Sequence, residues 1–123
     1  MGWRLCGIRG ATTVSDNGIA TVEQAVLELL TTMQERNHFA ASEISSAIFT
    51  TTPDLTTIFP SQVARKYLPG WEYVPLLDLA QLPVHGSLPS CIRVLLQVNC
   101  EKAQADIHHV YLRSAQNLRP DLL

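Results

Sequence analysis

The sequence predicts a mixed α/β sheet of the α+β class, with its helices on one face. Its 123 residues suit one domain with a single core, spanning residues 1–123. Several segments alternate apolar and polar residues with a period of two, which is typical of strands, while another repeats apolar residues at helical spacing. The order of the segments is strand, helix, strand, helix, strand, strand, strand. These two helices are too few to cover both faces of a sheet.

The first half of the chain predicts a strand followed by a long helix. Residues 3–14 form the strand, because β-branched residues gather at its end. Residues 16–18 (Asp-Asn-Gly) form a turn. Thr21 and Gln24 have the spacing of a capping box, so we expect a helix from Thr21 to about Asn37. Its apolar residues recur on one face, which we expect to pack on the sheet.

The rest of the chain predicts shorter elements and one long strand. Pro60 is tolerated in the first turn of a helix, because its missing N–H would have no partner there. Since little helix covers the later strands, we expect another subunit to cover an apolar face of the sheet. The expected elements are a strand at 44–52, a helix at 59–67, a strand at 72–77, a loop at 80–89, a strand at 90–101, a helical turn at 103–107, a strand at 109–112 and an irregular tail at 119–121.

Composition argues against several classes of protein. No apolar run approaches the ~20 residues of a membrane-spanning helix, and the N-terminus lacks the apolar core of a secretory signal. The net charge of −2 argues against a nucleic-acid partner, which needs a basic surface. Three cysteines without CxxC spacing suggest free thiols and a cytoplasmic protein. Adjacent His108 and His109 point to opposite faces of a strand, so we expect no metal site.

Arg93 lies in the middle of the long strand, on the face opposite its apolar row. A guanidinium leaves water only when something pairs with it. Arg9, Arg65 and Arg119 also occupy strand or loop positions, and Tyr111 adds a hydroxyl. Any one of these arginines alone is better explained by a structural salt bridge. Together, without acidic partners at matching spacing, they favour a site for a small polyanion, since arginine binds carboxylates with two parallel hydrogen bonds.

A series of short motifs runs in order through nearly the whole chain: GIRGATT at 7–13, TPDL at 52–55, FP at 59–60, GWEYVPLL at 70–77, GSLP at 86–89, CIRV at 91–94, HVYL at 109–112 and LRPDL at 118–122. Together they resemble the trimeric, barrel-type (AroH-type) monofunctional chorismate mutases. The resemblance implies an intramolecular Claisen rearrangement of chorismate to prephenate, with no cofactor. It also implies a homotrimer in which the sheets build a pseudo-α/β-barrel with sites between subunits.

The resemblance also implies roles for the catalytic residues. Arg93 is the cation at the ether oxygen, where negative charge develops as the C–O bond breaks, and it also reaches the side-chain carboxylate. Arg9 binds the same carboxylate, and Tyr111 donates its hydroxyl to it. Because the family's sites lie between subunits, we expect Arg9 and Tyr111 to face Arg93 across an interface.

Four further residues match substrate-binding positions of the family. Phe59 forms part of an apolar wall. Arg65 and Arg119 lie at the mouth of the pocket, where they guide and hold the dianion. Leu118, in the LRPDL motif, also contacts the substrate.

Gln81 departs from the resemblance, because the family usually has a glutamate there that accepts a hydrogen bond from the ring hydroxyl. A glutamine carbonyl still accepts but carries no charge. We expect Asp78 to supply the anionic acceptor, with Gln81 assisting. Gln62 replaces a basic residue near the pocket mouth, which suggests weaker binding. Two alternatives remain: a non-catalytic chorismate or dicarboxylate sensor or partner subunit, and a structural trimer whose arginines pair with the protein's own carboxylates.

Overall fold

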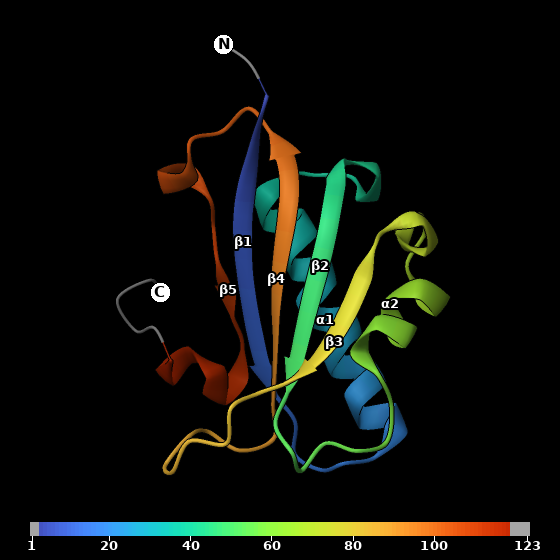
Figure 1. The fold of residues 1–123 in the computed structure, drawn as a ribbon, viewed down its shortest axis with the longest axis vertical. Helices are drawn as coiled ribbons and strands as arrows, with labels where there is room; N and C mark the ends of the chain where they lie inside the picture. The colour runs from blue at the N-terminus through green and yellow to red at the C-terminus, as the bar shows by residue number, and fades with distance from the viewer. Residues whose placement is uncertain (1–2, 119–123) are drawn as a thin grey trace.

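A computed structural model describes residues 3–118, which form one five-stranded mixed sheet with two α-helices on one side (Figure 1). The strand order is β3-β2-β4-β1-β5; β4 runs antiparallel to β1 and β2, whereas the pairs β2–β3 and β1–β5 are parallel. The predicted fold class is confirmed. The elements are β1 (Arg4–Thr13), α1 (Ile19–Asn37), β2 (Ile44–Thr51), α2 (Pro60–Tyr67), β3 (Leu76–Ala80), β4 (Cys91–Cys100) and β5 (Val110–Tyr111).

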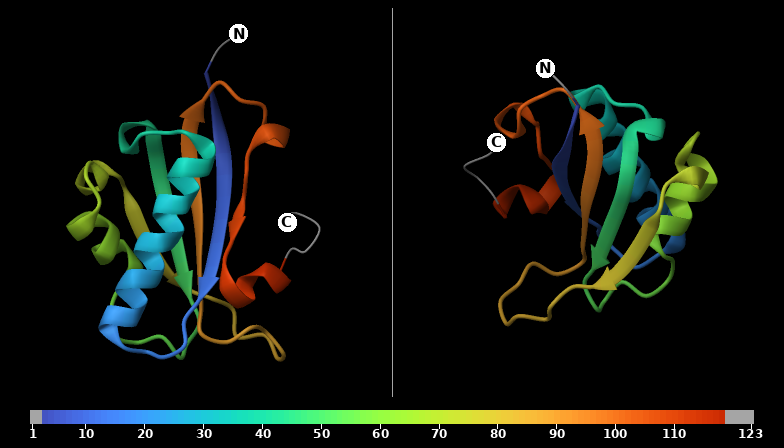
Figure 2. Two further views of the ribbon diagram at one scale, coloured as in Figure 1. Left: turned by 180° about the vertical axis from the view of Figure 1, so that it is seen from behind. Right: turned by 45° about the horizontal axis from the view of Figure 1, so that its top comes forward.

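Both helices cover the same face of the sheet, as the view from behind shows (Figure 2). α1 buries one apolar row against that face, and the facing side chains of β4 are equally buried. α1 packs closely on β1 at Gly10, where an added Cβ would lie 2.4 Å from Met33 Sδ. The buried row of α1 comprises Val22, Ala25, Val26, Leu29, Leu30 and Met33, and that of β4 comprises Ile92, Val94, Leu96 and Val98.

The opposite face of the sheet, here called the open face, carries no α-helix within residues 3–118. Leu77 and Leu79 of β3 are 59% and 50% exposed there, and Leu95 of β4 is 37% exposed. Only a small cluster around Ala11 and Tyr111 shields part of it. The uneven helix cover that the sequence predicts is therefore present. None of the described helices is long and apolar enough to cross a membrane.

Two side chains extend the short β5 along the outer edge of β1. The side-chain amide of Gln104 donates to the Gly7 carbonyl (2.7 Å) and accepts from the Gly7 N–H (3.0 Å). The Nδ1 atom of His109 accepts from the Arg9 N–H at 3.0 Å. At the next two residues of β1, Gly10 and Ala11, the backbone of β5 pairs with β1 directly. The edge of β1 is therefore paired from Gly7 onward, although β5 has only two residues.

The start of α1 differs from the prediction. The helix begins at Ile19 with Gly18 as its N-cap residue, so Thr21 lies inside the first turn and the predicted capping box does not form. The reason is local: the Asp16 carboxylate accepts the Gly18 N–H at 2.7 Å, which closes the turn and directs the next residue into the helix.

The third strand also lies later than predicted. β3 covers residues 76–80 rather than 72–77, and residues 71–73 form a 3₁₀ turn. Trp71 is fully buried, which fixes this turn against the core. Pro75 has no N–H, but its carbonyl accepts from Ala47 at 3.0 Å and starts the parallel pairing with β2. The predicted helical turn at 103–107 is confirmed as a 3₁₀ turn at Gln104–Asp106, whereas the last strand, at 110–111, is shorter than predicted.

Gly10→Ala is expected to destabilise the fold, because the new methyl group has to displace the buried Met33 side chain. Overpacking of this kind costs about 1–3 kcal/mol. The matched control is Gly7→Ala on the same strand, where the added Cβ would lie 3.7 Å from Leu95 Cδ1, an ordinary contact. Thermal unfolding followed by circular dichroism measures both. Equal melting temperatures for the two variants would contradict this account of the packing between α1 and β1.

Candidate active site

A cavity of about 300 Å³ opens on the open face, over β1, β2, β4 and β5. Four of its lining residues are ones that the sequence predicted for the site, and we call it the cationic pocket. The predicted lining residues are Arg9, Arg93, Tyr111 and Leu118. Lining residues that the sequence analysis missed include Ile48, Thr50 and Leu95.

The register of the sheet brings the two arginines of the cationic pocket together. In the antiparallel ladder between β1 and β4, Arg9 lies opposite Leu95 and Ala11 lies opposite Arg93. Arg9 and Arg93 are therefore diagonal neighbours on one face. Tyr111 lies beside Ala11 in the parallel pair β1–β5. We expected Arg9 and Tyr111 to face Arg93 across a subunit interface, and the structure already brings all three residues of one chain to one cavity.

Four buried polar atoms have no hydrogen-bond partner in the described chain: Thr50 Oγ1, Arg93 Nε and Tyr111 Oη, which belong to residues that line this pocket, and Gln81 Oε1. Thr50 lies directly opposite Arg93 in the β2–β4 ladder. Gln81 continues β3 beyond its last residue by donating its N–H to Thr51 O at 3.0 Å. Its alternation with Leu77 and Leu79 places it on the open face. Since each unpaired buried group costs about 1–3 kcal/mol, this set is suited to a polar ligand.

Neither Arg9 nor Arg93 has a carboxylate partner within residues 3–118. The salt bridge found there joins Arg113 Nε to Glu28 Oε1 at 3.5 Å, away from the pocket lining. The structural alternative of the sequence analysis needs carboxylates of the protein at both arginines, and the described part of the chain does not supply them. The two guanidinium groups are thus available to a ligand with negative charge.

The TPD turn at 52–54 fixes the start of β4, two residues before Arg93. The Asp54 carboxylate accepts from the N–H (2.9 Å) and hydroxyl (3.2 Å) of Ser90, and Thr52 Oγ1 accepts from the Cys91 N–H (2.9 Å). The Thr52 hydroxyl, more than Ser90, lowers the pKa of the Asp54 carboxyl. A carboxyl whose pKa falls on folding stabilises the fold above its unfolded pKa and loses that contribution as the pH drops through the folded value. The hydrogen bonds of Asp54 to Ser90 are therefore intact at neutral pH.

The Cys91 thiol lies beside the Arg93 guanidinium, two residues along the same face of β4. Burial raises the pKa of this thiol, and the neighbouring Arg93 opposes the rise through a hydrogen bond and its charge. Cys91 is fully buried, so it fills space behind the arginine as a neutral thiol.

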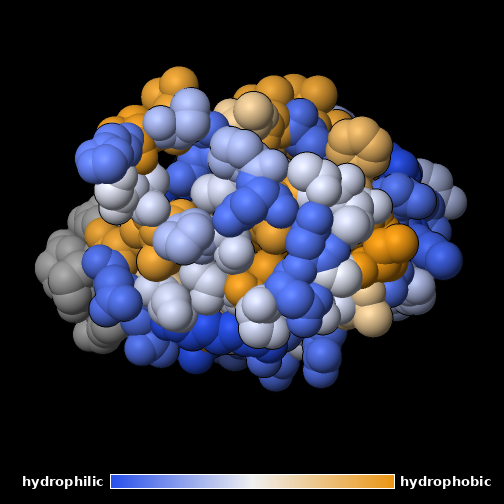
Figure 3. Space-filling model, turned by 90° about the horizontal axis from the view of Figure 1, so that it is seen from below, coloured by the Kyte–Doolittle hydropathy of each residue, from blue (hydrophilic) through white to orange (hydrophobic). Residues whose placement is uncertain are grey.

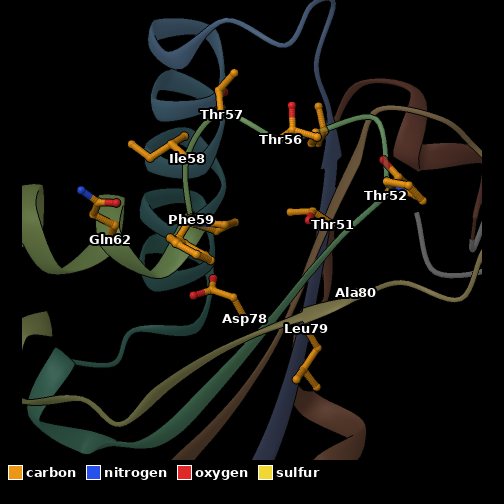
Figure 4. A pocket seen from close by; sticks show the side chains of 13 residues that line it. Thr51, Thr52, Thr56, Thr57, Ile58, Phe59, Gln62, Asp78, Leu79 and Ala80 are labelled. Atoms are coloured by element: carbon orange, nitrogen blue, oxygen red, sulfur yellow. The ribbon is translucent and has the colours of Figure 1, made fainter.

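A second cavity of about 440 Å³ lies between β2, β3 and the start of α2, and we call it the Phe59 cavity. Phe59, Gln62 and Asp78 all line it (Figure 4). Phe59 is 65% exposed, which is unusual for a large apolar side chain. Apolar side chains are exposed in several separate areas at this end of the molecule (Figure 3). The Phe59 cavity therefore offers an apolar wall with little charge.

Within a single chain, the side chains of Asp78 and Gln81 do not lie close enough together to bind the same group of a ligand. Asp78 lies opposite Phe49 on the helix-covered face, whereas Gln81 lies on the open face. The Asp78 carboxylate accepts from the N–H of Ser61 (3.0 Å) and from its hydroxyl. It thereby caps the first turn of α2, where negative charge is favourable. The expected partnership of Asp78 with Gln81 is not formed, because residues three apart on a strand point to opposite faces.

The remaining predicted residues lie apart from both cavities or outside the described part. Arg65 is exposed in the last turn of α2 and lines neither the cationic pocket nor the Phe59 cavity. Arg119 lies outside the described residues. Within the cationic pocket, two guanidinium groups and a hydroxyl lie together, an arrangement typical of proteins that bind small ligands with negative charge.

The comparisons with known proteins give this class a family. The model of the family "Chorismate mutase type I" matches residues 5–122. The chain is 47% identical over 117 residues to a chorismate mutase AroH of Thermus thermophilus, covering 94% of each chain. It is 40% identical over 116 residues to a chorismate mutase AroH of Bacillus subtilis, covering 94% of this chain and 91% of the relative. A solved chorismate mutase from Clostridium thermocellum superposes with a TM-score of 0.86 at 43% identity, over 90% of this chain and 97% of the other.

The chain therefore belongs to the chorismate mutase type I family. Its members are isomerases that convert chorismate to prephenate on the route to aromatic amino acids, and this is the activity of the chain. The family suggested by the sequence motifs is confirmed.

Gln81→Leu and Asp78→Asn are expected to separate binding from stability, because the two side chains lie on opposite faces. Gln81→Leu removes a buried acceptor from the open face and lowers kcat/KM for chorismate about tenfold, with little change in melting temperature. Asp78→Asn removes the charge that caps α2, which costs about 1 kcal/mol of stability. Although Asp78 lines the Phe59 cavity, its carboxylate is held by Ser61, so kcat/KM changes less than about threefold. Steady-state kinetics and thermal unfolding measure both variants. The reverse pattern would show that Asp78 is the acceptor.

Proposed function

We propose that the chain isomerises chorismate by holding the dianion in the cationic pocket, with Arg93 as the central catalytic residue. The observation that carries the proposal is the set of unpaired polar atoms around one cavity, Arg93 Nε and Tyr111 Oη among them. The rearrangement needs no proton transfer and no covalent intermediate. The protein has to hold a compact conformer, neutralise two carboxylates and place a fixed positive donor at the ether oxygen.

Arg93 meets the requirement for a fixed donor. It lies on β4, the middle strand of the sheet, which is paired along its length to both neighbours. A guanidinium held by such a scaffold needs little reorganisation when charge builds on the ether oxygen. Its planar group also reaches the side-chain carboxylate of the substrate while another N–H faces the ether oxygen.

Arg9 and Tyr111 are proposed to bind the side-chain carboxylate from the neighbouring strands β1 and β5. Both line the cationic pocket beside Arg93. Gln81 is proposed to accept a hydrogen bond from the ring hydroxyl, since its buried Oε1 has no partner in the described chain. Leu118 closes the apolar side of the pocket.

We propose that three copies assemble with their open faces inward as a pseudo-α/β-barrel, which also covers the exposed Leu77 and Leu79. In this assembly the Phe59 cavity of one copy completes the cationic pocket of its neighbour. The exposed Phe59 then gains a partner surface, and Arg65 is proposed to lie at the mouth of the site. Arg119, the other arginine predicted there, lies outside the described residues. A cytoplasmic location agrees with the free thiols of Cys6, Cys91 and Cys100.

Arg93→Ala is expected to lower kcat about 10²–10³-fold, the usual effect of removing one preorganised donor from a developing oxyanion. Arg93→Lys recovers only part of the loss, because a point charge does not reproduce the planar fork. The loss of the diene absorbance of chorismate measures both. Near-normal turnover in Arg93→Ala would overturn the mechanism. A wild-type protein that binds chorismate in calorimetry without converting it would support the sensor alternative, which Gln81 favours, and Gln81→Glu would then test whether the missing charge is the cause.

Mixing two inactive variants tests the shared site. Arg93→Ala disables the cationic pocket, and Phe59→Asp disables the apolar wall. If neighbouring copies share each site, trimers refolded from an equal mixture contain about a quarter of intact sites, and activity returns. Variants refolded separately and assayed together without exchange of subunits serve as the control. No recovery in co-refolded trimers of confirmed mass would show that each site is built by one chain.

A further inference from the structure

The N–H of Arg9 is bonded by a side chain and not by the neighbouring strand. It donates to His109 Nδ1 at 3.0 Å, and backbone pairing between β1 and β5 begins only at the next residue. His109 comes two residues before Tyr111, the other group that we assign to the substrate carboxylate. The imidazole thus joins the strand that carries Arg9 to the strand that carries Tyr111, at the edge of the cationic pocket.

The backbone next to His109 is itself fixed from the other side of the molecule. Asn37, buried at the end of α1, donates from Nδ2 to the His108 carbonyl (2.8 Å) and accepts at Oδ1 from the His108 N–H (2.8 Å). Ile107, one residue earlier, is buried. The segment is therefore held by α1 before His109 reaches β1, and the position of the imidazole is determined by the core rather than by a free loop.

Arg9 needs such support. Its side chain is exposed and has no ion pair within the described residues, and Gly10 follows it directly. On a strand the direction of a side chain follows from the backbone at that residue. A backbone that shifts at Arg9 moves the guanidinium several ångströms away, because the long side chain amplifies the change. On the inner edge of β1 the ladder with β4 holds the chain, and on the outer edge His109 does so at Arg9 itself.

The contact also defines the state of the imidazole. A ring nitrogen accepts a hydrogen bond only when it carries no proton, so this contact requires a bare Nδ1 and assigns the proton of the ring to Nε2. The other neutral tautomer and the imidazolium both present an N–H to the Arg9 N–H, and neither forms this bond.

We infer that His109 is a positioning residue for the reaction: by accepting the Arg9 N–H at Nδ1, it sets the direction of the guanidinium that binds the substrate carboxylate. The inference rests on the proposed role of Arg9. His109 touches no substrate in this scheme and acts on binding through Arg9. Its loss therefore affects binding of the dianion more than the chemical step at Arg93.

Three variants test the inference. His109→Ala removes the acceptor and raises KM for chorismate about three- to tenfold, the range of one lost hydrogen bond, while kcat changes less than about twofold. His109→Asn keeps an oxygen acceptor close to the place of Nδ1 and stays within about twofold of the wild-type KM. His108→Ala is the matched control, since the hydrogen bonds of His108 to Asn37 use its backbone and not its side chain, and its KM stays at the wild-type value.

A double-mutant cycle shows whether His109 works through Arg9. Arg9→Ala raises KM by itself, and adding His109→Ala to it has no further effect if the imidazole only orients the guanidinium. The dissociation constant of chorismate from calorimetry is measured for the same four proteins. A wild-type protein without turnover contradicts the proposed function, whereas the cycle in dissociation constants still reports on His109.

Melting temperatures and a long-range ¹H–¹⁵N NMR spectrum complete the test. We expect the His109 signals, assigned by their loss in His109→Asn, to show a bare Nδ1 and a protonated Nε2. An unchanged KM in His109→Ala, a His109→Asn variant no better than His109→Ala, or an equal effect of His109→Ala with and without Arg9 each overturns the inference. If His109→Ala does not fold, the KM of His109→Asn and the tautomer of His109 in the wild type still test the inference.

Discussion

A guanidinium in the middle of a β-sheet constrains everything around it. Arg93 is carried by the central strand, with β1 and β2 bonded on either side. Helices cover one face of that sheet, so a charge on the covered face would be desolvated without compensation. The alternation of β4 places Arg93 on the open face instead. A cavity opens there, and no carboxylate of the described residues forms an ion pair with Arg93. The open face therefore carries the cationic pocket, and it is also the face that we propose a neighbouring copy covers.

The two faces of the sheet have different roles in the protein. Residues on the covered face build the core and anchor the helices: Phe49 is fully buried, and Asp78 caps α2 through Ser61. Residues on the open face line the cationic pocket, to which we assign the charges and hydrogen bonds of the reaction. This division explains how a sheet with few helices carries a precise site, because each strand contributes to stability with one face and to binding with the other.

The motifs and periodicities of the sequence were sufficient for the fold class, the helix α1 and the strand β4, because these depend on local spacing. The arginines and Tyr111 of the pocket were also predicted, through the family resemblance. What the sequence did not reveal depends on tertiary contacts. Because Trp71 is buried in a 3₁₀ turn at residues 71–73, β3 begins at Leu76 and not at the predicted residue 72.

The position of β3 along the chain also determines the faces of Asp78 and Gln81. Gln81 lies on the same face as the cationic pocket, and Asp78 lies on the helix-covered face. Thr50 was missed because its importance comes from its register opposite Arg93, and no local pattern in β2 marks that register. His109 was set aside as a metal ligand, and its hydrogen bond to the backbone of Arg9 follows only from the pairing of distant segments.

The side chains along the outer edge of β1 also affect how the protein meets other chains. An unpaired strand edge is a template for another β-strand, and proteins that leave one exposed risk adding foreign strands and forming fibrils. β5, with two residues, is too short to protect a ten-residue strand. Gln104 occupies both backbone groups of Gly7, and His109 occupies the N–H of Arg9, so an intruding strand finds these positions already taken. The edge that supports Arg9 is thus also closed to aggregation by strand addition.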